Sequence, residues 1–171
     1  DPKMYPHPIK AFDGVAAGTQ AHLNILDLSF RNKIDTVLIL EDDIEFIENF
    51  VNIFDSLSQY VPDYWDILYL GGMYHSGGMK PFKINDHIAR VHDMMSTHAY
   101  ALRYPITGTI YGDITCTYPH LLNSMDGYLT KFQKLYEAYA FTAPLAWQRA
   151  DHSSIQNAHR DYVNIFKRKF I

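Results

Sequence analysis

The chain has 171 residues, about the size of one domain, and a chain of this length can bury roughly 70 % of the surface that its unfolded form exposes. Hydrophobic residues make up 47 % and charged residues 20 %, which excludes a disordered or low-complexity chain. The formal net charge of -4 argues against a nucleic-acid partner, because no overall positive field is available to hold a phosphate backbone. The single cysteine, Cys116, excludes an intramolecular disulfide framework and a cysteine zinc site. We therefore expect one globular domain over residues 1–171.

The sequence predicts no membrane segment. No apolar run approaches the ~18 residues that a membrane-spanning helix needs, and the first residues do not resemble a signal peptide. These observations slightly favour a cytoplasmic location. The absence of an initiating methionine suggests that the chain is a piece of a longer protein, and the oligomeric state is left open.

The first half of the chain alternates between strand-like and helix-like patterns. Short apolar runs predict strands over residues 8–12, 36–40 and 66–70, and apolar residues at helical spacing predict helices over residues 15–31 and 50–57. The second run, TVLIL, does not alternate with polar residues, which is typical of a central strand covered on both faces. The resulting β-α-β-α-β order predicts an α/β fold with a mostly parallel central sheet flanked by helices. Ligands of such folds bind beyond the carboxyl ends of the strands.

The second half gives weaker signals. The glycine-containing stretch 71–93 predicts loops and short irregular strands around the rim of a site. Thr117, which precedes Tyr118-Pro119, is a candidate N-cap for a helix that Asp126-Gly127 interrupts. The remaining predictions are a strand over residues 97–102, resumed helical spacing over 129–136, an extended segment over 141–147 and a tail or linker over 157–171.

Three adjacent acids, Glu41, Asp42 and Asp43, follow the predicted strand 36–40 at its carboxyl end. Adjacent carboxylates repel one another, and in a partly desolvated crevice each needs a cation or hydrogen-bond donors to stay ionised. Mg²⁺ and Mn²⁺ usually take one or two protein carboxylates and fill their other positions with water and substrate phosphate oxygens. The motif therefore predicts a divalent metal site for a phosphate-bearing substrate. The alternative is that the acids begin a loop, cap the next helix and face water.

The same motif carries a resemblance to a known family. Residues 37–44 (VLILEDDI) resemble the "LILEDD" segment of the family 25 glycosyltransferases, which include lipooligosaccharide galactosyltransferases and collagen hydroxylysine galactosyltransferases. The resemblance covers about residues 9–156. Further segments similar to the family follow in the same order: 9–14 (IKAFDG), His22, 65–71 (WDILYLG), 98–102 (HAYAL), Met125-Asp126 and 144–155.

Two segments depart from the family pattern. The family opens with a strand carrying a "V-I-N-L-x-x-R-x-x-R" segment that helps to hold the nucleotide, and only proline-rich chain precedes Ile9. We therefore expect that the usual N-terminal strand is missing. Residues 104–117 also differ from the short turn of the family.

The resemblance implies a GT-A-like fold that uses a UDP-sugar donor and Mn²⁺ (or Mg²⁺). The implied reaction moves a hexose, galactose or glucose, with inversion onto a hydroxyl of a glycan or glycoprotein. By the same resemblance Asp43 binds the metal, Asp42 lies at the metal and the nucleotide, and Glu41 lies beside the nucleotide. His152 is a candidate late imidazole ligand for the metal, and the alternative is an exposed loop histidine.

Inverting transfer needs a carboxylate that deprotonates the acceptor hydroxyl. Asp126 is the first candidate, Asp113 and Asp151 are reserves, and the alternative for Asp126 is an ordinary helix N-cap. Gly71 and Gly72, after a predicted strand, permit close backbone approach to a ligand or only shape a turn. The alternative function is a catalytically silent GT-A-like domain that binds a glycan or a partner protein.

Overall fold

The structure, a computed structural model, describes residues 13–74, 77–117, 124–153, 158–161 and 163–167. The predicted strand 8–12 lies outside these residues. The described helices are α1 (Asp13–Arg31), α2 (Phe50–Ser58), α3 (Ile106–Thr117), α4 (Met125–Leu135) and α5 (Val163–Phe166). The predicted helices over 15–31 and 50–57 are therefore confirmed.

In the part of the chain that the structure describes, a six-stranded sheet forms the centre of the fold, and three two-stranded sheets lie around it. In spatial order the central strands are β1 (Thr36–Leu40), β8 (Ala99–Arg103), β3 (Ile67–Tyr69), β9 (Ala138–Phe141), β6 (Ile88–Arg90) and β5 (Phe82–Lys83). The small sheets pair β2 (Ile44–Phe46) with β10 (Ala146–Gln148), β4 (Met73–Tyr74) with β7 (Met94–Met95), and β11 (Asp151–Ser153) with β12 (Ala158–Arg160).

The prediction of a mostly parallel sheet is wrong, because among the described strands of this sheet only β3 and β9 pair in parallel. The cause is β8, which lies between β1 and β3 and runs antiparallel to both. Two antiparallel pairings restore the direction, so β1, β3 and β9 still point the same way. Their carboxyl ends therefore meet at one edge of the sheet, together with the start of β8.

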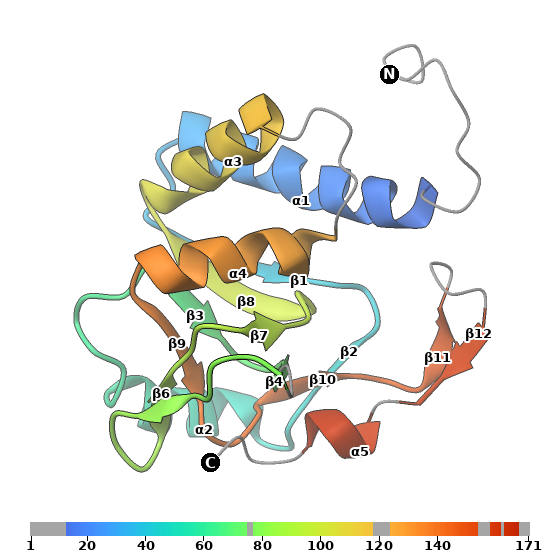
Figure 1. The fold of residues 1–171 in the computed structure, drawn as a ribbon. Coiled ribbons are helices and arrows are strands. Elements are labelled where there is room, and N and C mark those ends of the chain that lie inside the picture. The colour runs from blue at the N-terminus through green and yellow to red at the C-terminus, as the bar shows by residue number, and fades with distance from the viewer. Residues whose placement is uncertain (1–12, 75–76, 118–123, 154–157, 162, 168–171) are drawn as a thin grey trace.

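Helices cover both faces of the sheet (Figure 1). Helices α1, α3 and α4 pack over one face, where Leu23 and Ile110 join Ile67 in a buried cluster. Helix α2 packs over the opposite face, where Phe54 lies against the cluster that contains Leu68. Consecutive residues of β3 thus point to opposite faces, as the pleat of a strand requires.

Strand β1 departs from its predicted environment. Within the described residues it lies at an edge of the six-stranded sheet, not at its centre. Ile39 is buried, but Leu38 and Leu40 remain 45 % and 42 % exposed. Helices α1 and α3 cover one face of β1, which accounts for the burial of Ile39. On the other face, α2 packs against residues of β3, β8 and β9, and Leu38 and Leu40 stay exposed.

Thr117 is not the N-cap of a following helix, because it is the last residue of α3. Residues 118–123, where that helix was predicted to begin, lie outside the described residues. The overlooked signal for α3 is Ile106, Ile110 and Ile114, which recur at helical spacing and are buried. Asp126 does not interrupt a helix but lies in the first turn of α4.

The predicted tail over 157–171 contains regular structure, since β12 and α5 lie within it. Within the described parts of the chain, no helix combines the length and the apolar composition that crossing a membrane requires.

Candidate functional site

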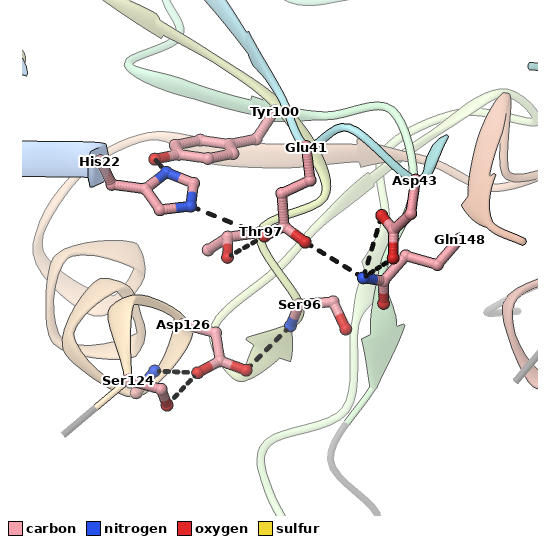
Figure 2. A network of polar contacts seen from close by, with 10 residues as sticks. His22, Glu41, Asp43, Ser96, Thr97, Tyr100, Ser124, Asp126 and Gln148 are labelled. Atoms are coloured by element: carbon pink, nitrogen blue, oxygen red, sulfur yellow. Dashed lines mark hydrogen bonds and ion pairs between the residues drawn. The ribbon is translucent and has the colours of Figure 1, made fainter. Parts of the chain in front are cut away.

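The predicted acidic motif lies at the edge where β1 and β3 end and β8 begins. The backbone N–H of Glu41 donates to the carbonyl oxygen of His98 at 2.9 Å. Residues 41–43 therefore leave β1 directly beside the segment that leads into β8. Figure 2 shows the polar side chains that gather there from α1, β8, β10 and the first turn of α4.

Glu41 is held by contacts from three different elements (Figure 2). Its Oε1 accepts a hydrogen bond from the Thr97 hydroxyl at 2.9 Å and lies 3.6 Å from His22 Nε2. Its Oε2 accepts a hydrogen bond from Gln148 Nε2 at 3.0 Å. Burial alone would raise the pKa of the Glu41 carboxyl, but the contacts with His22 and Thr97 outweigh burial and lower the pKa below its ordinary value. Glu41 is therefore an ionised and firmly held carboxylate.

His22 links Glu41 to the core. Its Nδ1 lies 3.0 Å from the Tyr100 hydroxyl, and both side chains are buried. Burial raises the pKa of Tyr100 well above its ordinary value, so the hydroxyl stays protonated and can donate to Nδ1. When the hydroxyl donates to Nδ1, a neutral ring carries its proton on Nε2, the nitrogen that faces Glu41.

Asp43 is held less firmly than Glu41. Its two carboxylate oxygens lie 3.4 Å and 3.2 Å from Gln148 Nε2. Burial raises the pKa of the Asp43 carboxyl, the charges of Glu41 and Asp42 add to the rise, and the hydrogen bond from Gln148 only partly opposes it. The Asp42 side chain is exposed. An ionised Asp43 is thus the carboxylate that a nearby cation would stabilise most.

Asp126 braces the segment that precedes Thr97. Its Oδ2 accepts a hydrogen bond from the backbone N–H of Ser96 at 3.2 Å, and Oδ1 accepts one from the backbone N–H of Gly127 at 2.8 Å. The Ser124 hydroxyl also donates to Oδ1. Ser96 has a φ of 75°, a conformation that is uncommon for a residue with a side chain, and the bond to Asp126 holds it there.

The alternative role of Asp126 as a helix N-cap is wrong in its simple form. The N-cap of α4 is Ser124, whose side chain makes no capping hydrogen bond to the helix. Asp126 instead occupies the first turn, where a negative charge is favourable near the helix N-terminus.

The reserve base Asp113 lies in an ion pair outside this group of side chains. Both oxygens of Asp113, on α3, accept hydrogen bonds from Lys131 Nζ on α4 at 2.7 Å, so Asp113 is half of an ion pair. Asp151 and His152 belong to β11, where their backbones pair with Arg160 and His159 of β12. The side chains of these four β11 and β12 residues lie outside the described part of the structure.

The two candidate ligand glycines are packed against the chain itself. A Cβ at Gly71 would lie 1.9 Å from the carbonyl oxygen of Ala146 and 2.7 Å from His98 Nε2. A Cβ at Gly72 would lie 2.9 Å from the carbonyl oxygen of Met95. In this structure the missing side chains of the two glycines therefore allow neighbouring segments of the protein to pack closely.

The buried side chain of His98 lies beside Gly71. Its side chain is fully buried, and Nε2 lies 3.3 Å from the carbonyl oxygen of Ala146. Burial lowers the pKa of the imidazole, and the contact with Ala146 and the charges of Glu41 and Asp43 only partly oppose that shift. His98 is thus a neutral packing residue under the acidic motif.

Sequence reasoning did not place Thr97 or Tyr100 in the site. The only available signal was their position at the start of a predicted strand. Their contact with Glu41 and His22 depends on the pairing of β8 with β1, which local patterns do not reveal.

The donor set at the edge fits a divalent cation that shares its coordination with a ligand. Among the residues that the structure describes, no three His, Cys, Asp or Glu side chains converge as a complete metal site. Asp42 and Asp43 supply two carboxylates, the number that Mg²⁺ usually takes from a protein when phosphates and water complete its sphere. The raised pKa of Asp43 also indicates a negative charge in need of compensation.

A scan against models of protein families finds no match, and a search of curated proteins finds none either. The resemblance to the family 25 glycosyltransferases therefore stays a prediction.

Proposed function

We propose that this chain is a metal-dependent, inverting glycosyltransferase domain of GT-A-like type. It moves a hexose, galactose or glucose, from a UDP-sugar to a hydroxyl of a glycan or a glycoprotein. The observation that carries the proposal is the unequal state of the acidic motif. Glu41 is tied to three donors, while Asp42 is exposed and Asp43 contacts the amide of Gln148.

The donor end of the proposed site consists of Asp42 and Asp43. These two carboxylates would hold Mn²⁺ or Mg²⁺. When bound, the ion offsets the negative charge that develops on a diphosphate leaving group. Half-burial of Asp43 limits its exposure to water, so that its charge acts over a short distance in a medium of lower dielectric constant.

The proposed base is Asp126. In the transfer step, an acceptor oxygen bonds to the anomeric carbon as the bond from that carbon to the phosphate oxygen breaks. The nucleotide leaves with the electron pair, and Asp126 takes the proton of the acceptor hydroxyl. Hydrogen bonds from Ser96, Gly127 and Ser124 orient the carboxylate, and Oδ2, which accepts only the bond from Ser96, keeps a further lone pair for that proton.

One observation favours a second candidate, a catalytically silent domain that binds a glycan or a partner protein. Glu41 has contacts with Thr97, His22 and Gln148 that would be kept for the sake of the fold alone. On this reading the fold explains why Glu41 is present. It explains Asp42 and Asp43 less well, because these two acids make fewer contacts with the rest of the protein.

A donor-binding assay separates the two candidates. Thermal stabilisation is measured with UDP-galactose and UDP-glucose, with and without Mn²⁺, alongside release of UDP from each sugar. The transferase predicts stabilisation and UDP release that both require Mn²⁺. Stabilisation by a free glycan with no UDP release would favour the silent domain, and no response to any nucleotide sugar would overturn the transferase.

A further inference from the structure

We infer that Gln148 is a positioning residue for Asp43, and that Glu41 supports the metal site by orienting Gln148 and not as a metal ligand. This inference rests on the proposed function, because it assigns supporting roles around the proposed ligand Asp43. It also changes the expected role of Glu41, which the resemblance placed beside the nucleotide.

The amide of Gln148 bridges the two carboxylates (Figure 2). Nε2 lies 3.0 Å from an oxygen of Glu41 and 3.2 Å from the nearer oxygen of Asp43. A side-chain amide nitrogen carries two hydrogens, so one can serve each carboxylate. The bridge therefore uses the full donor capacity of this nitrogen.

The backbone fixes where the bridge begins. Strand β10 pairs with β2 so that Gln148 stands opposite Ile44, and the backbone N–H of Arg149 donates to the carbonyl oxygen of Asp43 at 2.9 Å. The main chain of Gln148 is thus registered against the residue that follows Asp43. Only the side-chain torsion angles of Gln148 then remain free, and the hydrogen bond to Glu41 restricts them.

Glu41 is suited to support and not to ligation. One of its oxygens already faces Thr97 and His22, and the other accepts the hydrogen bond from Gln148. A turn of Glu41 toward a metal would break contacts with three side chains at once. Its negative charge also strengthens the hydrogen bond that it accepts from the amide.

A neutral donor suits this position. An ammonium or guanidinium group between the two carboxylates would neutralise them and repel an incoming cation. The amide orients Asp43 while leaving its charge intact. Hydrogen-bond partners behind a metal ligand typically contribute 10- to 100-fold to metal affinity or activity.

The test is a double-mutant cycle on Mn²⁺ affinity. We compare wild type, Gln148→Met, Glu41→Gln and the double variant by electron paramagnetic resonance of free Mn²⁺, with kcat and KM for UDP release measured in parallel. Each single variant should weaken Mn²⁺ binding by about 10- to 100-fold. The double variant should be no weaker than the worse single variant, because both substitutions break the same bridge.

Glu45→Gln is the matched control. Glu45 lies on β2 and accepts a hydrogen bond from Trp147 Nε1 at 3.1 Å, so this variant removes one negative charge and touches the neighbour of Gln148 without touching the bridge. Its Mn²⁺ affinity should stay within about twofold of wild type, a change of under 0.5 kcal/mol.

The outcomes separate this inference from the proposed function. Additive losses in the double variant would show that Glu41 acts on the metal site independently of Gln148 and would overturn the inference. A lower free energy of unfolding with unchanged Mn²⁺ affinity would show a purely structural role and would overturn it as well. A wild-type chain that binds no Mn²⁺ in the presence of UDP-sugar would overturn the proposed function itself.

Discussion

Glu41 and Asp43 lie two residues apart in one acidic motif, yet their surroundings differ. Glu41 is held by donors from α1, β10 and the start of β8, and its pKa is lowered. Asp43 contacts a neutral amide, is crowded by two negative neighbours, and its pKa is raised. The surroundings of Glu41 therefore favour its charged form, whereas the surroundings of Asp43 oppose its charged form.

The largest expected effect on stability comes from the closely packed side of the site. Gly71→Ala places a methyl group 1.9 Å from the carbonyl oxygen of Ala146, and both segments would have to shift to accept it. We expect the free energy of unfolding to fall by about 3 kcal/mol or more in urea titrations.

Gly18→Ala is the control for that variant. Gly18 lies within α1, and a Cβ there meets no atom within 4 Å. Alanine should raise the free energy of unfolding by about 0.5 to 1 kcal/mol through its helix propensity. Equal effects of the two substitutions would contradict the packing described around Gly71.

A smaller loss is expected at Asp126. The two oxygens of Asp126 accept from the backbone N–H groups of Ser96 and Gly127, and asparagine has only one acceptor oxygen. In Asp126→Asn the amide NH₂ group must therefore face one of these two N–H donors. The free energy of unfolding should fall by about 1 to 3 kcal/mol. Asp113→Asn, which breaks a surface ion pair with Lys131, should cost less than about 1 kcal/mol.

The transfer activity of Asp126→Asn must therefore be measured together with its free energy of unfolding. A folded variant that loses transfer to the acceptor, and keeps Mn²⁺ and donor affinity, supports Asp126 as the base. Unchanged transfer with ordinary pH dependence would exclude it.

Acidification should change the free energy of unfolding in opposite directions through Glu41 and Asp43. The lowered pKa of Glu41 gives stability that is present above 4.5 and lost as the pH falls through the pKa of the folded state. The lowered pKa of the buried His98 also removes stability as the pH falls below 6.5, because the unfolded imidazole binds a proton first.

Asp43 should behave in the opposite way. Its raised pKa means that the folded state binds a proton before the unfolded state does, so acidification toward 3.8 adds stability from this group. Urea titrations between pH 7 and pH 4 on wild type and Asp43→Asn measure the difference. A stability difference between the two proteins that does not change with pH would contradict the raised pKa.

The local elements of the fold were predictable, but the strand order was not. Periodicity places α1 and α2, and the apolar runs place β1 and β3. The insertion of β8 between β1 and β3 depends on pairings such as Leu38 with Ala101, which are distant in sequence and carry no local signal. That insertion makes the sheet mostly antiparallel.

The site was partly predictable for a related reason. The acids follow β1 directly, and the direction of β1 relative to β3 survives the insertion of β8, so the expected edge of the sheet is still where the acids lie. The donors to Glu41 come from α1, from β10 and from the segment that leads into β8, and only the assembled fold brings them together.

The most direct measurement of the central claim is Mn²⁺-dependent release of UDP from UDP-galactose and UDP-glucose by wild type and by Asp43→Asn. Wild type should turn over only with the metal. Asp43→Asn should lose at least about 100-fold in rate, the upper end of what loss of a supporting partner costs, with a free energy of unfolding no lower than that of wild type. Turnover by Asp43→Asn at the wild-type rate, or none by wild type with Mn²⁺ and either donor, would contradict the proposed site.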